Sequence, residues 1–340
     1  MQMRIKALMA ALSLLLLGSL SFADQNVAGY NRINVPANSD VRLSVPFNTT
    51  PYDGSGNPDG NAVFTVVSVS SGSKVNVAAG SLTSGKFNAA DVTKNSYYVR
   101  FLDGNAAGLW MTIKSNDANG FVLDDTLPTQ RAALLGRVAA GNKFRVHKHH
   151  TVSSLFPPEL FNYSFVNNTA LLLYQNDIGA MSQNPPAWKT VSYTTSGGGR
   201  WVGAGVDGNT ILRPETQFVL RNGASRTLTV VTSGIAPDHP ISMLIATGGD
   251  LVIGSGYPVP IVLNNSGLGG TSNRAVLFFD NTTPGQNKPA VKTASYTTSG
   301  GGRWVGSGVT GLELINASEV IKFRLPATET GTIVTINKPY

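Results

Sequence analysis

Short runs of β-branched and aromatic residues, separated by Gly, Asn, Ser and Pro, fill most of the chain. Such runs predict short strands joined by turns. Helical periodicity is almost absent after the N-terminal stretch, and only short turns of helix are predicted, at 131–140 and 158–161. The clearest strand-like runs are Phe64–Val69, Tyr97–Phe101, Thr227–Val231 and Thr332–Ile336. The pattern therefore predicts an all-β protein.

Eleven residues, YTTSGGGRWVG, occur twice without a change, at Tyr193–Gly203 and at Tyr296–Gly306. The two copies are 103 residues apart. Over the longer stretches 189–208 and 292–311 only three positions differ, namely Val191/Ala294, Ala204/Ser307 and Asp207/Thr310. A repeat at a fixed period indicates a duplicated structural module.

A third, degenerate copy is predicted upstream, with Trp110 equivalent to Trp201 and Trp304. In addition, Val35–Leu43 resembles Ile245–Ile253 at an offset of 210 residues, which is close to two repeat lengths. We therefore expect about three tandem modules of roughly 100 residues each, folded as β-sandwiches or as barrel-like units. The predicted boundaries are 24–147 for the first module, 148–244 for the second and 245–340 for the third.

The N-terminal residues predict a signal peptide over 1–23, with the mature chain beginning at Asp24. Arg4 and Lys6 precede the apolar run 7–17, and Ser21-Phe22-Ala23 provides small residues at a cleavage site. The apolar run is shorter than the roughly 20 residues of a membrane span, and no later segment is long and apolar enough to qualify. We therefore expect an exported protein without a transmembrane segment in its mature chain, in the periplasm, on the outer surface or in the medium.

The amino-acid composition excludes several classes of protein. The chain has no cysteine, which excludes a disulfide framework and a thiolate zinc site. The 26 Lys and Arg residues exceed the 19 Asp and Glu residues, but they are spread along the chain. Because phosphate backbones are bound by clustered cations, we do not expect nucleic acid as a partner.

The YTT-GGGRWVG module, the DN-GQNKPA-KT stretch at 280–293 and the terminal KPY resemble an uncharacterised family of exported bacterial proteins. The resemblance covers nearly the whole mature chain and is most specific at 189–208 and 287–311. It implies a bacterial exported protein and no particular activity. The first module departs most from the pattern, because it has no triple glycine.

The repeated glycine stretch has two interpretations. In the first, the glycines form a hairpin turn that needs positive φ, and the tryptophan that follows fills the module core. In the second, the glycine amides and the neighbouring arginine bind an anion, and the exposed indole stacks on a sugar ring. The candidate ligand-binding residues are then Arg200, Trp201, Arg303 and Trp304.

One loop places oxygen-bearing side chains at every second position, as calcium loops do: Asp53, Ser55, Asn57 and Asp59. The resemblance is incomplete, because Pro58 stands at the sixth position and Phe64 at the twelfth, where such loops have Gly and Glu. A plain surface loop explains the same residues. We expect no cofactor, with calcium at this loop as the alternative.

Three histidines cluster after the predicted strand at 144–146. If the strand continues, His147 and His149 point to the same face and could bind zinc or nickel, with His150 turned away. No nearby carboxylate completes such a site, so a solvated strand end near a module boundary is the alternative interpretation.

No catalytic constellation is visible. The chain has no Gly-x-Ser-x-Gly, no His-Glu-x-x-His and no cysteine nucleophile, and Asp238-His239 is an isolated pair in a predicted turn. We therefore expect a non-catalytic structural or surface protein of the bacterial envelope or of an extracellular assembly, with itself or other envelope components as partners. The alternatives are a carbohydrate-binding protein with a polysaccharide partner and, third, a glycoside hydrolase.

Overall fold

The computed structural model describes residues 28–45, 47–125, 134–157, 167, 169–174, 187–214, 217–245, 249–317, 319–329 and 332–340. Strands make up 46% of it and helices 4%, so the all-β prediction is confirmed. The predicted signal peptide 1–23, the expected mature N-terminus and the helical turn predicted at 158–161 lie outside the described residues.

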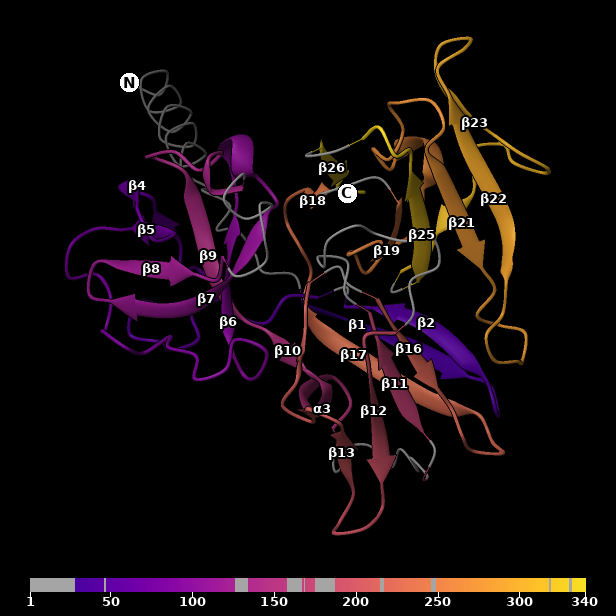
Figure 1. Cartoon of the computed structure of the whole chain (residues 1–340), viewed down its shortest axis with the longest axis horizontal. Helices are drawn as coiled ribbons and strands as arrows, with labels where there is room; N and C mark the ends of the chain where they lie inside the picture. Colours follow the sequence, from indigo (N-terminus) through magenta and orange to yellow (C-terminus); the bar gives the residue numbers. More distant parts are fainter. Residues whose placement is uncertain are drawn as a thin grey trace, which may run out of the picture.

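Three separate clusters of buried apolar side chains define three modules. One cluster lies between Val66 and Val146, and another between Ile241 and Ile336. The remaining cluster joins Val35–Val45 to side chains from 152 to 230. In Figure 1 these modules lie at the left, at the upper right and at the lower centre, respectively. Their sheets remain open, so the barrel-like alternative is not what the chain adopts.

The second module consists of a six-stranded sheet that faces two pairs of strands across its core, and all its pairings are antiparallel. The order of the sheet is β14 (Val206–Asp207), β13 (Arg200–Gly203), β12 (Lys189–Thr194), β11 (Ala170–Leu173), β16 (Gln217–Arg221) and β2 (Asp40–Ser44). The pairs are β1 (Ala28–Val35) with β17 (Leu228–Ile235), and β10 (His150–Thr151) with β15 (Ile211–Leu212). The short helix α3 (Val152–Leu155) follows β10.

The third module has the same arrangement. Its five-stranded sheet has the order β23 (Arg303–Val305), β22 (Ala290–Thr297), β21 (Ala275–Phe279), β25 (Val320–Leu325) and β19 (Gly249–Gly254). The facing pairs are β18 (Ile241–Ile245) with β26 (Thr332–Ile336), and β20 (Ile261–Val262) with β24 (Leu314–Ile315); the 3-10 turn η2 (Leu263–Asn265) follows β20. In both modules the first strand thus pairs with the last, as β1 does with β17 and β18 with β26. The second large pairing also matches, because β2 pairs with β16 and β19 pairs with β25.

The first module forms one seven-stranded sheet. Its order is β3 (Phe64–Thr65), β9 (Lys143–Lys148), β6 (Tyr97–Phe101), β7 (Trp110–Asp117), β8 (Gly120–Leu123), β5 (Lys74–Asn76) and β4 (Ser68–Ser70); the 3-10 turn η1 (Gly104–Ala106) follows β6. The portion β3-β9-β6-β7-β8 has the same strand order as β2-β16-β11-β12-β13 of the second module. All three modules therefore share the order of their central strands.

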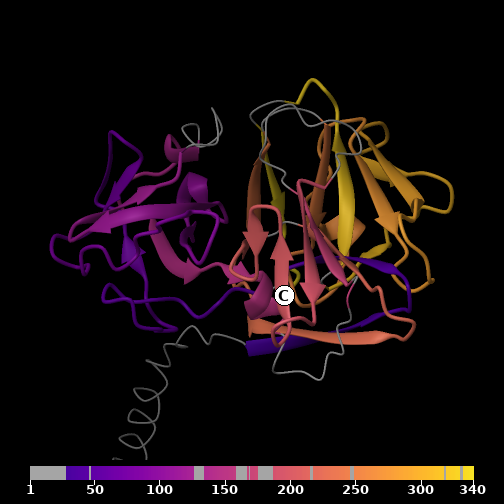
Figure 2. The ribbon, with the colours of Figure 1, turned by 60° about the horizontal axis from the view of Figure 1, so that its bottom comes forward.

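The predicted module boundaries need correction, because the second module is interrupted. Strands β1 and β2, which we expected in a module over 24–147, pair with β17 and β16 and contribute to the second core. Figure 2 shows β1, in indigo, lying along β17 at the bottom of the molecule. The first module is inserted between β2 and β10, and the third module begins at β18 rather than at 245. Backbone pairing between distant segments decides these boundaries, and local sequence patterns do not report it.

The proposed equivalence of Trp110 with Trp201 and Trp304 is also wrong. Trp110 begins β7, whereas the other two tryptophans lie on β13 and β23, which correspond to β8. The residue of β8 that is equivalent to Trp201 is Phe121. Phe121 is the second residue of β8 and pairs with Asn116 on β7, just as Trp201 is the second residue of β13 and pairs with Tyr193 on β12. Phe121 is fully buried, so a phenyl ring takes the place of the indole in the first core.

Candidate functional site

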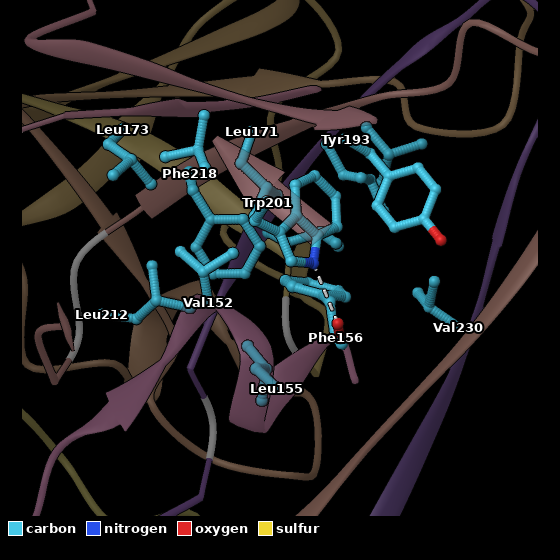
Figure 3. Close-up of a cluster of buried hydrophobic side chains, with 14 of the residues drawn as sticks. Val152, Leu155, Phe156, Leu171, Leu173, Tyr193, Trp201, Leu212, Phe218 and Val230 are labelled. Carbon is cyan, nitrogen blue, oxygen red and sulfur yellow. Dashed lines mark hydrogen bonds between the residues drawn. The ribbon is translucent and has the colours of Figure 1, made fainter. Parts of the chain in front are cut away.

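The tryptophans of the repeated stretch belong to the module cores. Trp201 is 2% exposed and Trp304 is 5% exposed. The Trp201 Nε1–H donates a hydrogen bond to the carbonyl oxygen of Phe156 at 3.0 Å, and the indole packs edge-on against Tyr193, as Figure 3 shows. Tyr296 and Trp304 repeat this geometry, with the same 68° between ring planes. The core interpretation is therefore confirmed, and an indole that stacks on a sugar is excluded at both positions.

The glycines form the predicted hairpin turns. The three glycines of the first turn have φ values of 73°, 89° and 84°, and those of the second have 71°, 92° and 80°. These values lie in the left-handed region that favours glycine. A Cβ on Gly199 would lie 2.2 Å from the hydroxyl oxygen of Tyr193, and one on Gly302 would lie 2.4 Å from that of Tyr296. Backbone conformation and close packing thus explain the glycines.

The outward faces of the two hairpins are identical. Side chains alternate between the faces of a strand, and the five that point away from the core in the β12–β13 hairpin match those in the β22–β23 hairpin. They are Thr190/Thr293, Ser192/Ser295, Thr194/Thr297, Arg200/Arg303 and Val202/Val305. The one difference within the paired segments, Val191/Ala294, is a buried position. Packing in the core does not account for identical residues on the outer face.

Arg200 and Arg303 are available for binding. Both residues are exposed, and neither guanidinium makes a salt bridge with a described residue. The two hairpins extend from opposite ends of the molecule in Figure 1, β12–β13 toward the bottom and β22–β23 toward the top. The chain therefore presents the same polar face twice, in two directions.

The loop that suggested calcium is a turn closed by its own hydrogen bonds. Asp53 Oδ1 accepts hydrogen bonds from the backbone N–H groups of Ser55 at 2.9 Å and Asn57 at 2.8 Å, and these bonds to Asn57 and its neighbours lower the pKa of Asp53. Asn57 turns its amide nitrogen, a donor, toward the carboxylate, and Asp59 accepts from the Asn61 N–H at 3.0 Å. The four side chains do not converge as ligands, so the surface-loop interpretation holds.

His147 and His149 also differ from both predictions. Each is 2% exposed, so this is not a solvated strand end. The Nδ1 of His147 lies 2.7 Å from the carbonyl oxygen of Thr49, and the Nε2 of His149 lies 3.1 Å from the hydroxyl of Thr112. Both rings pack against Tyr98. Among the described residues, no three His, Cys, Asp or Glu side chains gather where they could hold a metal ion.

Burial keeps His147 and the neighbouring His150 neutral. It lowers the pKa of His147 to about 3 and that of His150 to about 4, because a charged imidazolium would lose its hydration there. Sequence reasoning missed this burial because it treated the strand end as a module boundary. The outer face of β6 and β9 instead contacts two connecting segments: Asn48 and Thr49, which follow β2, lie against Tyr98 and His147, and Asp238, between the second and third modules, lies against Arg145.

Asp238 and His239 belong to this covered junction. Asp238 Oδ1 lies 2.6 Å from His239 Nδ1, and Arg145 of the first module donates to Asp238 Oδ2 at 2.9 Å. Tyr340, at the C-terminus, donates its hydroxyl to the carbonyl oxygen of Pro237 at 2.6 Å. Asp238 therefore links the first module, through Arg145, to the connection that leads into the third.

Fold and surface together define a three-module all-β protein with one interrupted module and two copies of an exposed hairpin face. No family model, no curated protein and no solved structure matches this chain. Within the described part of the chain, none of the helices combines the length and the apolar character that a bilayer crossing needs.

Proposed function

We propose that this chain is a non-catalytic, exported structural or surface protein of the bacterial envelope or of an extracellular assembly, and that its two hairpin faces bind two copies of the same partner. The observation that carries the proposal is the identity of the outward side chains on β12–β13 and β22–β23, while the buried Val191 is replaced by Ala294. The signal-like N-terminus and the absence of cysteine support export.

Recent duplication alone does not explain the identical faces, since the two modules differ at equivalent positions elsewhere. Strand pairing makes Arg42 equivalent to Val252, and Gln217 equivalent to Val320. Both positions lie within the same sheets as the hairpins. The identity is concentrated in the stretch that forms the hairpins, and this favours a shared binding role for them.

The chemistry of the faces favours an acidic partner. A guanidinium presents a planar fork of donors that matches carboxylate, phosphate and sulfate groups. Three hydroxyl groups lie beside it on each hairpin, and the valine near the strand edge adds a small apolar contact. An acidic polymer or protein of the envelope offers such groups repeatedly. Since the hairpins extend in opposite directions, one molecule would bridge two partners.

The alternative of a carbohydrate-binding protein that stacks sugars on Trp201 and Trp304 has lost its support, because both indoles are buried. A glycoside hydrolase would need two carboxylates placed across a cleft. Asp40 and Asp280 both line the cavity between the second and third modules, but Asp40 is held by Arg221 at 2.8 Å and Asp280 accepts hydrogen bonds from Thr282 and Thr283. We therefore retain the structural or surface role as the proposal.

The test is binding of the purified mature protein to envelope fractions of its native organism. We expect the wild type to sediment with the envelope, Arg200→Gln and Arg303→Gln each to bind about tenfold more weakly, and the double variant to remain in the supernatant. Lys114→Gln is the matched control, because Lys114 is an exposed cation on a strand of the first module. A wild type that stays soluble, or a double variant that still sediments, would overturn the proposal.

A further inference from the structure

A cavity separates the two larger sheets of the second and third modules. The outer faces of these sheets approach each other through β2 and β16 on one side and β19 and β25 on the other. Asn281 of the third module links the two sheets through hydrogen bonds. Its side chain accepts from the Arg42 N–H at 3.0 Å and donates to the Arg42 carbonyl oxygen at 3.1 Å. The cavity has a volume of about 360 Å³. This size falls within the range of about 300–1,000 Å³ that is common for small-molecule sites.

Three cations line this cavity: Arg42, Lys288 and Lys322. The Arg42 guanidinium lies 4.0 Å from the centroid of the Phe279 ring and forms no ion pair with a described residue. Lys288 Nζ donates to the carbonyl oxygen of Thr283 at 2.7 Å. Arg42 and Lys288 thus bring positive charge to the cavity without a paired carboxylate of their own.

Two of the nearby carboxylates have arginine partners, whereas Asp280, which lies close enough to Lys288 to oppose the lowering of its pKa, accepts hydrogen bonds from Thr282 and Thr283. Asp40 is held by Arg221, and Asp250 is held by Arg324 at 2.6 and 2.9 Å. Lys322 shares Asp250 at the longer distance of 3.7 Å. Asp280 offsets part of the charge of Arg42, Lys288 and Lys322, but the three lining cations still leave an excess of positive charge in the cavity.

The environment of the three cations supports an anionic occupant. Burial lowers the pKa of Arg42, of Lys288 and of Lys322, because each cation loses hydration that its neighbours do not replace. The charge does not follow from the duplication. Arg42 is equivalent to Val252, and Lys322 is equivalent to Val219, so each sheet contributes its own cation from a different strand.

Gln217 adds a second, independent observation. It lines the same cavity and is 2% exposed, and neither atom of its side-chain amide has a hydrogen-bond partner among the described residues. A buried amide without partners is costly, and such groups in native structures call for an explanation. A ligand that both accepts from Nε2 and donates to Oε1, as a hydroxyl group does, would satisfy it.

We propose that the cavity binds a small hydroxylated organic anion, with its charged group between Arg42, Lys288 and Lys322 and a hydroxyl group on the Gln217 amide. The lining also includes the apolar side chains of Val252, Leu277 and Pro289, which would contact the carbon skeleton of the ligand. Carboxylate and phosphate groups share the required chemistry. This site is separate from the hairpin faces, so it does not depend on the proposed function.

Titration calorimetry on the full mature protein tests the proposal, with D-glucuronate and glucose 6-phosphate as anionic probes and glucose as the neutral probe. We expect at least one anion to bind tenfold or more tightly than glucose. Tighter binding of glucuronate identifies the charged group as a carboxylate, and tighter binding of glucose 6-phosphate identifies it as a phosphate. If neither anion binds better than glucose, the proposal is wrong.

Variants locate the binding. Arg42→Met and Lys288→Met should each weaken the preferred anion at least tenfold, and Gln217→Leu should reduce the preference for the hydroxylated anion over acetate or inorganic phosphate. Lys288 is only partly buried, so its variant keeps the test valid if Arg42→Met fails to fold by circular dichroism. Lys114→Met is the control. Equal affinities for Lys288→Met and Lys114→Met would overturn the assignment, whatever the hairpins bind.

Discussion

Asp40 and Asp250 hold equivalent places in two modules, although 210 residues separate them in the chain. Each carboxylate pairs with an arginine on the adjacent strand through two hydrogen bonds, Asp40 with Arg221 and Asp250 with Arg324. The arginines are only 103 residues apart. The difference between the two separations corresponds to the first module, which is inserted after Asp40 and before the rest of its sheet.

Loss of either aspartate should destabilise its module. Breaking a buried pair leaves an uncompensated charge, so we expect Asp40→Asn and Asp250→Asn each to lower the free energy of unfolding by about 3 kcal/mol. The effect should be larger for Asp250, whose side chain is 0% exposed and also lies near Lys322. Urea denaturation measures it. Asp117→Asn, which removes an exposed pair with Lys74, should cost at most about 1 kcal/mol. Equal effects for Asp40 and Asp117 would contradict the prediction.

Trp201 should be a major contributor to the second core. Trp201→Ala should lower the free energy of unfolding by about 3–5 kcal/mol through loss of buried contacts. Trp201→Phe should cost less, but still about 1 kcal/mol for the hydrogen bond to Phe156 in addition to the lost volume. The control is Trp188→Phe, because Trp188 is 36% exposed. A Trp201→Ala protein as stable as this control would show that the indole is not a core residue.

Two glycines in the same turn should respond differently to alanine. Both Gly198 and Gly199 have positive φ, so alanine at either position is strained by about 1 kcal/mol. At Gly198 the new Cβ meets open space, whereas at Gly199 it would collide with the Tyr193 hydroxyl. Thermal unfolding should therefore show a clearly lower Tm for Gly199→Ala than for Gly198→Ala. Gly302→Ala and Gly301→Ala should repeat the difference in the third module, and equal Tm values within each pair would contradict it.

Stability should fall as the pH drops below neutrality. The folded-state pKa of His147 is about 3, and that of His150 is about 4, against about 6.5 in the unfolded chain. Below pH 6.5 the unfolded chain therefore binds protons that the folded chain excludes. We expect each histidine to remove roughly 1 kcal/mol per pH unit between pH 6.5 and 5, and no further change above pH 7. Urea titrations over this range measure the slope.

The matched variant for the pH prediction is His147→Gln. It removes one titrating group and should reduce the slope, even if it lowers stability at every pH. Carboxylates remain largely ionised down to pH 5, so they contribute little in this window. An unchanged slope in the variant would show that His147 is not held neutral by burial.

Much of the fold could be predicted from local patterns. Alternation of apolar residues and turn glycines predicted the all-β class. The repeat predicted the two hairpin turns that contain Gly197 and Gly300. The offset between Asp40 and Asp250 was misinterpreted as two repeat lengths, since an insertion shifts the numbering without changing the local pattern. Trp110 was misassigned because a phenyl ring, Phe121, fills the equivalent place in the first core.

The candidate sites were harder to predict. Whether Trp201 stacks on a ligand or on Tyr193 depends on which face of the sheet is covered, and the repeat alone does not decide this. The cavity between the sheets was missed altogether, because its residues come from six strands and the segments between them. The local pattern gave no signal of it: Arg42 occupies the outward position between the buried Val41 and Leu43, and a charged residue at such a position is typical of a solvent-exposed face.

The interruption of the second module has a kinetic consequence. Strand β1 begins the described chain, yet its partner β17 follows about 200 residues later, after the whole first module. Closing so large a loop is entropically unfavourable, and a high contact order slows folding. We therefore expect the first module to fold early and independently. The second module can complete its strand pairing only after β16 and β17 have been synthesised. Until then β1 and β2 are exposed, which makes this interval the one in which the chain most needs protection from aggregation.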